Sequence, residues 1–151
     1  SFAQHAKLGH INTSQLVLLL PEMKAADSTL QKFSASLESQ LKVMFSEYQS
    51  KVSDFKASEA TMAEPVRQTK AKEVDDLEQR IRQFQEDAET SVQKKEQELL
   101  APISKKVEEA IKSVAKEKGY AYIFDMSRGS VIYAQDSDDI MPMVKTKLGL
   151  K

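Results

Sequence analysis

The sequence lacks cysteine and tryptophan altogether, and only four glycines, four prolines and two histidines occur among its 151 residues. Without cysteine there is no disulfide, no thiolate metal ligand and no cysteine nucleophile. Two histidines are too few for a metal site built mainly from imidazoles. No run of 18 or more apolar residues offers a helix long enough to cross a membrane. These absences leave a chain whose function is not expected to depend on redox or metal chemistry.

Charge is abundant but balanced. The 22 Lys and Arg residues are offset by 23 Asp and Glu residues, and the formal net charge is −1 at pH 7. A protein held on nucleic acid by its overall field carries a strong excess of positive charge. We therefore expect no nucleic-acid partner.

The glycines lie near the chain ends, at positions 9, 119, 129 and 149, and none falls between His10 and Lys118. Over residues 22–118, Ala, Glu, Lys, Leu and Arg make up about half of the chain, a composition typical of long helices and coiled coils. A compact single-core domain would use more glycine in its turns. The middle of the sequence therefore predicts long helices.

A first long helix is predicted over residues 21–60. Its apolar residues recur at steps of three and four, close to the helical period, and so form one stripe. The stripe consists of Leu30, Phe33, Leu37, Leu41, Met44, Tyr48, Val52 and Phe55.

A second long helix is predicted over residues 65–118, where the same spacing resumes. Pro65 suits a first helical position because its missing N–H has no partner to lose there, and residues 61–65 form the predicted turn. The apolar series is interrupted around Lys95 and Glu96. It keeps its phase across Pro102, so we expect a bend there within one helix. Two such helices, antiparallel and joined by a short turn, cover each other's narrow stripe.

Short elements are predicted at both chain ends. Residues 8–12 read as a strand, and Thr13 or Ser14 is expected to cap a short helix over residues 15–20. Gly119 is expected to end the second long helix. Aromatic and branched residues then predict a hairpin of two strands, 120–125 and 131–134, around a turn at 127–130. Asp136 or Asp138 is expected to cap a last helix over residues 140–148.

These elements predict an α+β protein that is mainly α, with a long antiparallel helical hairpin on a small β body. The expected divisions are a tail at 1–6, the body at 7–20 and 119–151, and the hairpin at 21–118. Three short strands bury little apolar surface alone, so the body is expected to self-associate through its strand edges. The strand residues assigned to this contact are His10, Ile11, Tyr122, Ile123, Phe124, Val131, Ile132 and Tyr133.

Three hairpin residues are candidates for contact with another polypeptide. Met44, Phe45 and Met62 offer adaptable or off-stripe apolar surface, and methionine is suited to surfaces that accept many shapes. The alternative interpretation is internal: Phe45 widens the stripe between the helices, and Met62 packs on the tip.

No constellation for catalysis or metal binding is visible. His5 and His10 have no obvious further ligands nearby. Residues 136–139 are acidic, but they lack the glycine and the distal glutamate of an EF-hand loop. Asp125 has no identifiable acid or base partner and is expected to satisfy the adjacent turn. We expect no cofactor, no metal and no enzymatic activity.

The start of the chain admits two interpretations. Ser1 and Ala3 fit the small-residue positions of a signal-peptidase site, which would make Gln4 the first residue of an exported protein. The other interpretation is an ordinary tail.

Taken together, several short motifs resemble the Skp/OmpH family of periplasmic chaperones. The resemblance extends over nearly the whole chain. Each motif alone is weak evidence, but the order and spacing of the motifs together are fairly specific. The matching segments are residues 9–14, 20–26, 98–103, 110–120, 123–125, 131–133 and 138–140.

The resemblance implies a homotrimer shaped like a jellyfish, in which strands of all three subunits form the body and three hairpin tentacles surround a cavity. It implies an ATP-independent chaperone, exported to the periplasm by a signal peptide, that holds unfolded outer-membrane proteins until they reach the outer membrane. The best-known members are strongly basic, whereas residues 27–118 hold 16 basic and 18 acidic residues. Direct binding to lipopolysaccharide or to an anionic membrane is therefore not carried over.

Two further hypotheses compete with this one. A coiled-coil envelope scaffold or adaptor would use the hairpin to bind one specific folded partner, through one continuous apolar patch. A prefoldin-like cage would place its strands between the helices, whereas here the predicted strands lie at the chain ends.

Overall fold

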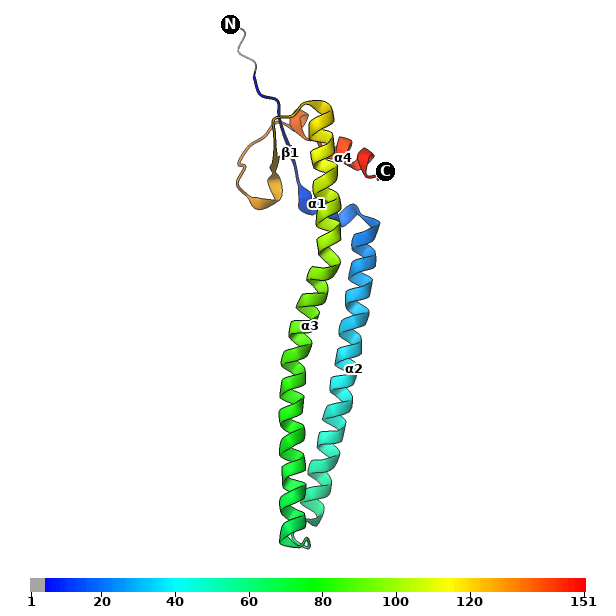
Figure 1. Cartoon of the computed structure of the whole chain (residues 1–151), viewed down its shortest axis with the longest axis vertical. Coiled ribbons are helices and arrows are strands. Elements are labelled where there is room, and N and C mark those ends of the chain that lie inside the picture. Colours follow the sequence, from blue (N-terminus) through cyan, green and yellow to red (C-terminus); the bar gives the residue numbers. More distant parts are fainter. Residues whose placement is uncertain (1–4) are drawn as a thin grey trace. The chain divides into compact units, whose positions relative to one another are not determined.

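The computed structural model describes residues 5–151, so the predicted cleavage site at Ser1–Gln4 lies outside the described residues. The described chain is mainly helical, as predicted (Figure 1). Its contacts divide it into two units, residues 28–96 and residues 5–27 with 97–151. The elements are β1 (Leu8–Ile11), α1 (Thr13–Leu19), α2 (Pro21–Ser58), α3 (Glu64–Lys118), β2 (Tyr122–Asp125) and α4 (Met141–Lys147), with single turns η1 (Met126–Arg128) and η2 (Asp136–Asp138).

The unit formed by residues 28–96 is a helical hairpin. The two long helices lie side by side, α2 in blue to cyan and α3 in green (Figure 1). Lys51 of α2 and Glu73 of α3 form an ion pair across the hairpin at 3.4 Å. Leu77 and Ile81 are almost fully buried between the helices. The apolar periodicity therefore predicted both helices and their pairing correctly.

The turn of the hairpin is held by main-chain hydrogen bonds. The amides of Thr61 and Met62 both donate to the carbonyl of Ser58 at 3.1 Å. The next helix starts at Glu64, one residue before the predicted start at Pro65. A carboxylate in the first turn of a helix is stabilised by the exposed N–H groups there, and Glu64 also accepts from Arg67 and Gln68.

The second unit contains a parallel two-stranded sheet. β1 pairs with β2 in the register Leu8↔Tyr122 to Ile11↔Asp125. Parallel strands need a long crossover connection between them. Here the whole segment from α1 to α3 is that connection.

The predicted strand at Val131–Ala134 is wrong for the single chain. These residues are irregular and pair with no strand, and β2 is followed by the turn η1 instead of a hairpin. Branched and aromatic residues favour a strand only where a neighbouring strand completes it. Within the described chain no strand pairs with them.

Apolar residues from both ends of the chain form one core. Ile11, Leu16, Leu20, Ile140 and Val144 are completely buried. They pack with residues of both long helices, namely Ala26, Ile103, Val107, Ala110 and Val114. The first turns of α2 and the last turns of α3 therefore fold with the strands.

Gly9 is a glycine because its surroundings leave no room for a side chain. A methyl group at this position would lie 2.9 Å from the ring of Tyr120 and 3.0 Å from methyl carbons of Ile123 and Ile140. The close approach lets β1 lie directly on the core.

The residues at the starts of α1 and α4 differ from those predicted to cap them. Asn12, not Thr13 or Ser14, caps α1, and its side chain accepts the amide of Gln15 at 3.0 Å. At α4 the carboxylate of Asp139 accepts the amide of Met141 at 2.8 Å, whereas Asp136 and Asp138 belong to η2. Asn12 and Asp139 lie one and two residues before their helices. Apolar periodicity does not resolve which polar residue near a helix start accepts the first amides.

The C-terminal part of α3 is one continuous helix that ends before Gly119, as predicted. The helix runs without interruption through Pro102 and ends at Lys118. Gly119 has a φ of +74°, and the amide of Tyr120 donates to the carbonyl of Ala115 at 2.9 Å. This is the left-handed glycine termination that turns the chain back toward β2.

Asp125 joins the end of β2 to the start of α1. Its carboxylate accepts from the hydroxyl of Thr13 at 2.7 Å, the amide of Thr13 at 3.2 Å and the amide of Ser127 at 3.0 Å. Partial burial opposes the charge, but the hydrogen bonds from Thr13 and Ser127 outweigh it and lower the pKa of Asp125 to about 2. The carboxylate thus satisfies the turn after β2, as expected, and also anchors α1.

Replacement of Asp125 by asparagine tests this anchor. The pKa of Asp125 is lower in the folded than in the unfolded chain, so its charge stabilises the fold above pH 4, and this contribution is lost as the pH falls from 4 to 2. We expect Asp125→Asn to lower the free energy of unfolding by about 1–2 kcal/mol at neutral pH, with the difference from wild type shrinking toward pH 2.

Urea unfolding between pH 2 and pH 7 measures this difference. Asp138→Asn is the matched control, since the Asp138 side chain is exposed and has no such partners. A difference that stays constant over the whole pH range would contradict the assignment.

Candidate interaction surfaces

The outward face of the small sheet is apolar and exposed. Side chains alternate along each strand, so Gly9, Ile11 and Ile123 point inward, while Leu8, Tyr122 and Phe124 point outward. Tyr122 is 64% exposed, and its ring stacks on that of Phe124 with the centroids 6.4 Å apart. Monomeric soluble proteins rarely leave such a patch uncovered.

A second exposed apolar segment follows η1. Ile132 is 100% exposed and Tyr133 is 80% exposed. The segment lies beside the sheet, where residues 130–134 and the strands border a hollow of about 500 Å³ together with Leu8, His10 and Phe124. His10 fixes the end of the segment, because its Nε2 lies 2.7 Å from the carbonyl oxygen of Gln135.

The structure separates the predicted oligomerisation residues into two groups. Ile11 is fully buried and Ile123 is partly buried in the core, so their side chains serve the single chain. The other group lies on the outward sheet face and on the adjoining segment. In it Tyr122, Phe124, Ile132 and Tyr133 are exposed, whereas His10 and Val131 are half-buried.

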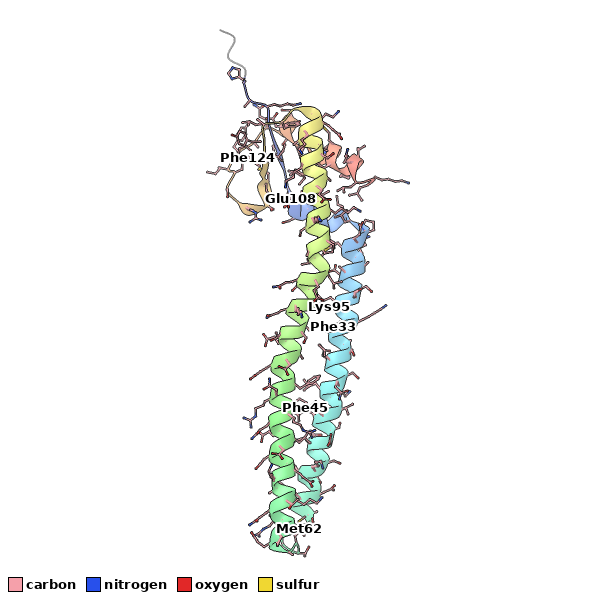
Figure 2. The ribbon with its side chains drawn as sticks, in the orientation of Figure 1. Phe33, Phe45, Met62, Lys95, Glu108 and Phe124 are labelled. Carbon is pink, nitrogen blue, oxygen red and sulfur yellow. The ribbon has the colours of Figure 1, made fainter. Side chains whose placement is uncertain are left out.

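The predicted contact residues of the hairpin are not gathered in one place. Met44 is half-buried, and Phe45 next to it is 40% exposed. Met62 is half-buried at the tip and borders a small hollow with Phe55 and Val74. Figure 2 shows Phe45 and Met62 at different levels of the hairpin.

A groove that the apolar periodicity did not reveal runs along one side of the hairpin. It has a volume of about 370 Å³. Its floor is made of half-buried apolar residues of both helices, namely Leu37, Leu41, Phe84, Ala88 and Val92. Leu77 and Ile81, by contrast, are 1% and 4% exposed. The small side chain of Ala88 is the signal that the sequence offered, since it leaves space where a larger residue would close the stripe.

The edges of the groove are polar and acidic. They are formed by Ser34, Glu38, Gln85, Glu89 and Gln93. Neither Glu38 nor Glu89 belongs to any of the ion pairs found in the described residues. The groove therefore combines an apolar floor with two carboxylates that form no close ion pair among the described residues.

The interruption of the apolar series at Lys95 has a structural explanation. The ammonium group of Lys95 on α3 lies 5.8 Å from the centre of the Phe33 ring on α2 (Figure 2). This distance is within the range of a cation–π contact. Lys95 thus occupies a position of the stripe with its charge over an aromatic ring, where the pattern would otherwise place an apolar residue.

Neither a metal-binding cluster nor a membrane-spanning helix is found within residues 5–151. No cluster of three or more His, Asp or Glu residues there is placed to hold a metal ion. None of the helices is sufficiently long and apolar to traverse a bilayer.

Comparisons with known proteins agree with this architecture. A family model described as outer membrane protein (OmpH-like) matches residues 7–148. Among solved structures, one described as an OmpH-like outer membrane chaperone from Caulobacter crescentus CB15 superposes with a TM-score of 0.82. The two chains are 17% identical, and the match covers 96% of this chain and 85% of the other. No curated protein matches the sequence significantly.

The role of Lys95 can be tested by making the stripe continuous. Lys95→Leu loses a cation–π contact worth about 0.5 kcal/mol but buries an apolar side chain against Phe33, so we expect a net gain in the free energy of unfolding of about 1 kcal/mol. Urea unfolding followed by circular dichroism measures the gain. The adjacent Lys94 is exposed, and Lys94→Leu should give no such gain. Equal effects of the two substitutions would show that Lys95 has no special place in the stripe.

Proposed function

The chain belongs to the OmpH-like outer membrane protein family, and from this membership we propose that it is a periplasmic chaperone that holds unfolded outer-membrane proteins without ATP. The observation that carries the proposal is the agreement of the family match over residues 7–148 with a fold shared with a protein described as an outer membrane chaperone. Export by a signal peptide ending near Ala3 is part of the proposal.

The hairpin surface has properties that suit a holding chaperone. Its exposed large apolar residues are scattered, with Val43 and Phe45 on α2 and Val66 on α3. Each can make only a weak contact, but several weak contacts acting together hold a flexible chain and still allow release. A scaffold that binds one folded partner would favour a single continuous patch, so the scattered arrangement supports the chaperone over the scaffold.

We propose that the functional form is a homotrimer. β1 and β2 pair with each other, and a bridge joins His10 to Asp139, so no strand of the described chain pairs with the outer side of β2. The main-chain amides of residues 131–134 likewise have no main-chain partner in the described chain. Pairing of the β2 edge of one copy with residues 131–134 of the next is a head-to-tail contact, and such contacts form a ring when the rotation from copy to copy closes. The number three rests on the resemblance to the family.

The net charge of residues 27–118 argues against anionic lipids as partners. Residues 27–118 carry two more acidic than basic side chains, and anionic lipids attract clusters of Lys and Arg. Direct binding to lipopolysaccharide or to an anionic membrane is therefore not part of the proposed function.

An aggregation assay tests the proposed function. A urea-unfolded outer-membrane β-barrel protein is diluted with and without a threefold excess of the purified chain, and light scattering is followed over time. We expect the chain to suppress scattering without ATP, because transient contacts keep the strand edges of its client from pairing. Scattering that is the same with and without the chain would refute the proposal, and a saturable complex with one native protein alone would favour the scaffold.

Ile132→Lys tests the proposed assembly. In the single chain Ile132 is 100% exposed, so the substitution leaves the monomer fold intact, whereas a charge at a strand edge opposes pairing with a second copy. We expect the mass measured by light scattering to fall toward the 17.0 kDa of one chain, with unchanged helix content. Val66→Lys, at an exposed apolar position of α3, should leave the mass unchanged. If Ile132→Lys leaves the mass of the assembly unchanged, this edge is not the interface.

A further inference from the structure

The residues that line the groove on the hairpin favour some polypeptide segments over others. We propose that it binds extended segments of unfolded clients that alternate apolar residues with Lys or Arg. This inference rests on the proposed holding function and names the part of the client that is recognised. It follows from the floor, the edges and the position of Phe45.

The floor provides the apolar contacts. Leu37, Leu41, Phe84, Ala88 and Val92 are only half-buried, so the described hairpin leaves them partly open to water. Phe45 follows Leu41 by one helical turn on the same face and is 40% exposed. Phe45 therefore adds a separate apolar contact one helical turn beyond the groove, so a bound segment can place one side chain in the groove and another on Phe45.

The edges determine which charge is accepted. Glu38 on α2 and Glu89 on α3 border the floor, and none of the ten residues that line the groove is basic. A Lys or Arg in a bound segment would meet a carboxylate at the edge of the groove, whereas an Asp or Glu would meet a like charge. Binding is thus expected to favour cationic segments.

The uncharged edge residues suit an extended main chain. Gln85, Gln93 and Ser34 offer amide and hydroxyl groups that donate to or accept from peptide N–H and C=O groups without regard to sequence. An unfolded chain exposes these main-chain groups along its whole length. The groove therefore combines sequence-independent hydrogen bonding with a preference for positive charge.

The hairpin as a whole also carries more acidic than basic side chains. Residues 28–96 hold 13 acidic and 11 basic side chains. A second hollow of the hairpin has a mixed lining, in which Lys51 and Arg80 lie among Glu47, Glu73 and Asp76. In the groove, by contrast, the charged lining residues are all acidic, and the charge preference should disappear when these two carboxylates alone are neutralised.

Two labelled peptides provide the probe. They have the same length and the same apolar residues at alternate positions, with Lys between them in one and Glu in the other. Fluorescence anisotropy with the full chain gives the dissociation constants at about 0.02 M and about 0.3 M salt, where the Debye lengths differ about fourfold. At low salt we expect the Lys peptide to bind about 5–10 times more tightly than the Glu peptide, as two surface charge contacts would give, and the preference to shrink at high salt.

Three variants locate the effect. Glu38→Gln/Glu89→Gln should abolish the preference for the Lys peptide. Glu47→Gln/Glu86→Gln changes the net charge by the same amount outside the groove and should keep it. Ala88→Leu fills the groove and should weaken binding of both peptides severalfold, with helix content unchanged and thermal stability equal or higher.

Several results would overturn the inference. These are equal affinity for the two peptides, no binding of either peptide, loss of the preference in both charge variants alike, and unchanged binding by Ala88→Leu. A change in the mass of the assembly with Ala88→Leu would show that a second copy of the chain occupies the groove instead. If the wild-type chain still suppresses aggregation while the peptides are not distinguished, the charge preference fails and the proposed function stands.

Discussion

The parallel pairing of β1 with β2 is the contact on which the rest of the structure depends. It joins residues 8–11 to residues 122–125 in a fixed register, so both ends of the long helical segment belong to one unit. Asp125 at the end of this pair also anchors the start of α1 through Thr13. The core beneath the strands consists of short contributions from β1, α1, α4 and the ends of both long helices. Without the strand pair, none of these pieces is large enough to fold alone.

The same pairing creates the surface that the proposed assembly uses. A sheet of two strands has only two small faces. One face packs on the core, and the other carries the exposed side chains of Tyr122 and Phe124. The next exposed residues along the chain, Ile132 and Tyr133, lie beside that face. The single chain thus leaves apolar side chains and unpaired main-chain groups in one place, and a second copy can cover both at once.

Much of the fold could be predicted from the sequence because helical periodicity is a local property. The stripes on either side of Pro65 identified both long helices, and Gly119 identified the end of the second. The strand predicted at residues 131–134 is absent from the described chain, because its side chains favour a strand but no neighbouring strand pairs with them there. The cap of α1 was placed after Asn12, and Asp139 at the start of α4 was not singled out, because several polar residues lie near each helix start.

The interaction surfaces were harder to predict than the fold. Periodicity records whether a residue is apolar and not how large it is, so it does not reveal that the small side chain of Ala88 leaves space for the groove. Likewise, Lys95 looked like a gap until its contact with Phe33 was visible. Phe45 was recognised as lying off the stripe, but its relation to the groove depends on how the two helices are aligned.

In the proposed assembly, residues 131–134 pair with a strand of another copy of the chain. Amide hydrogen exchange of the wild-type protein, measured at high concentration and again after extensive dilution, distinguishes this pairing from an isolated chain. In the single chain these amides have no main-chain acceptor among the described residues, so we expect slow exchange at high concentration and exchange at the rate of an unstructured chain after dilution. Fast exchange at both concentrations would rule out the pairing.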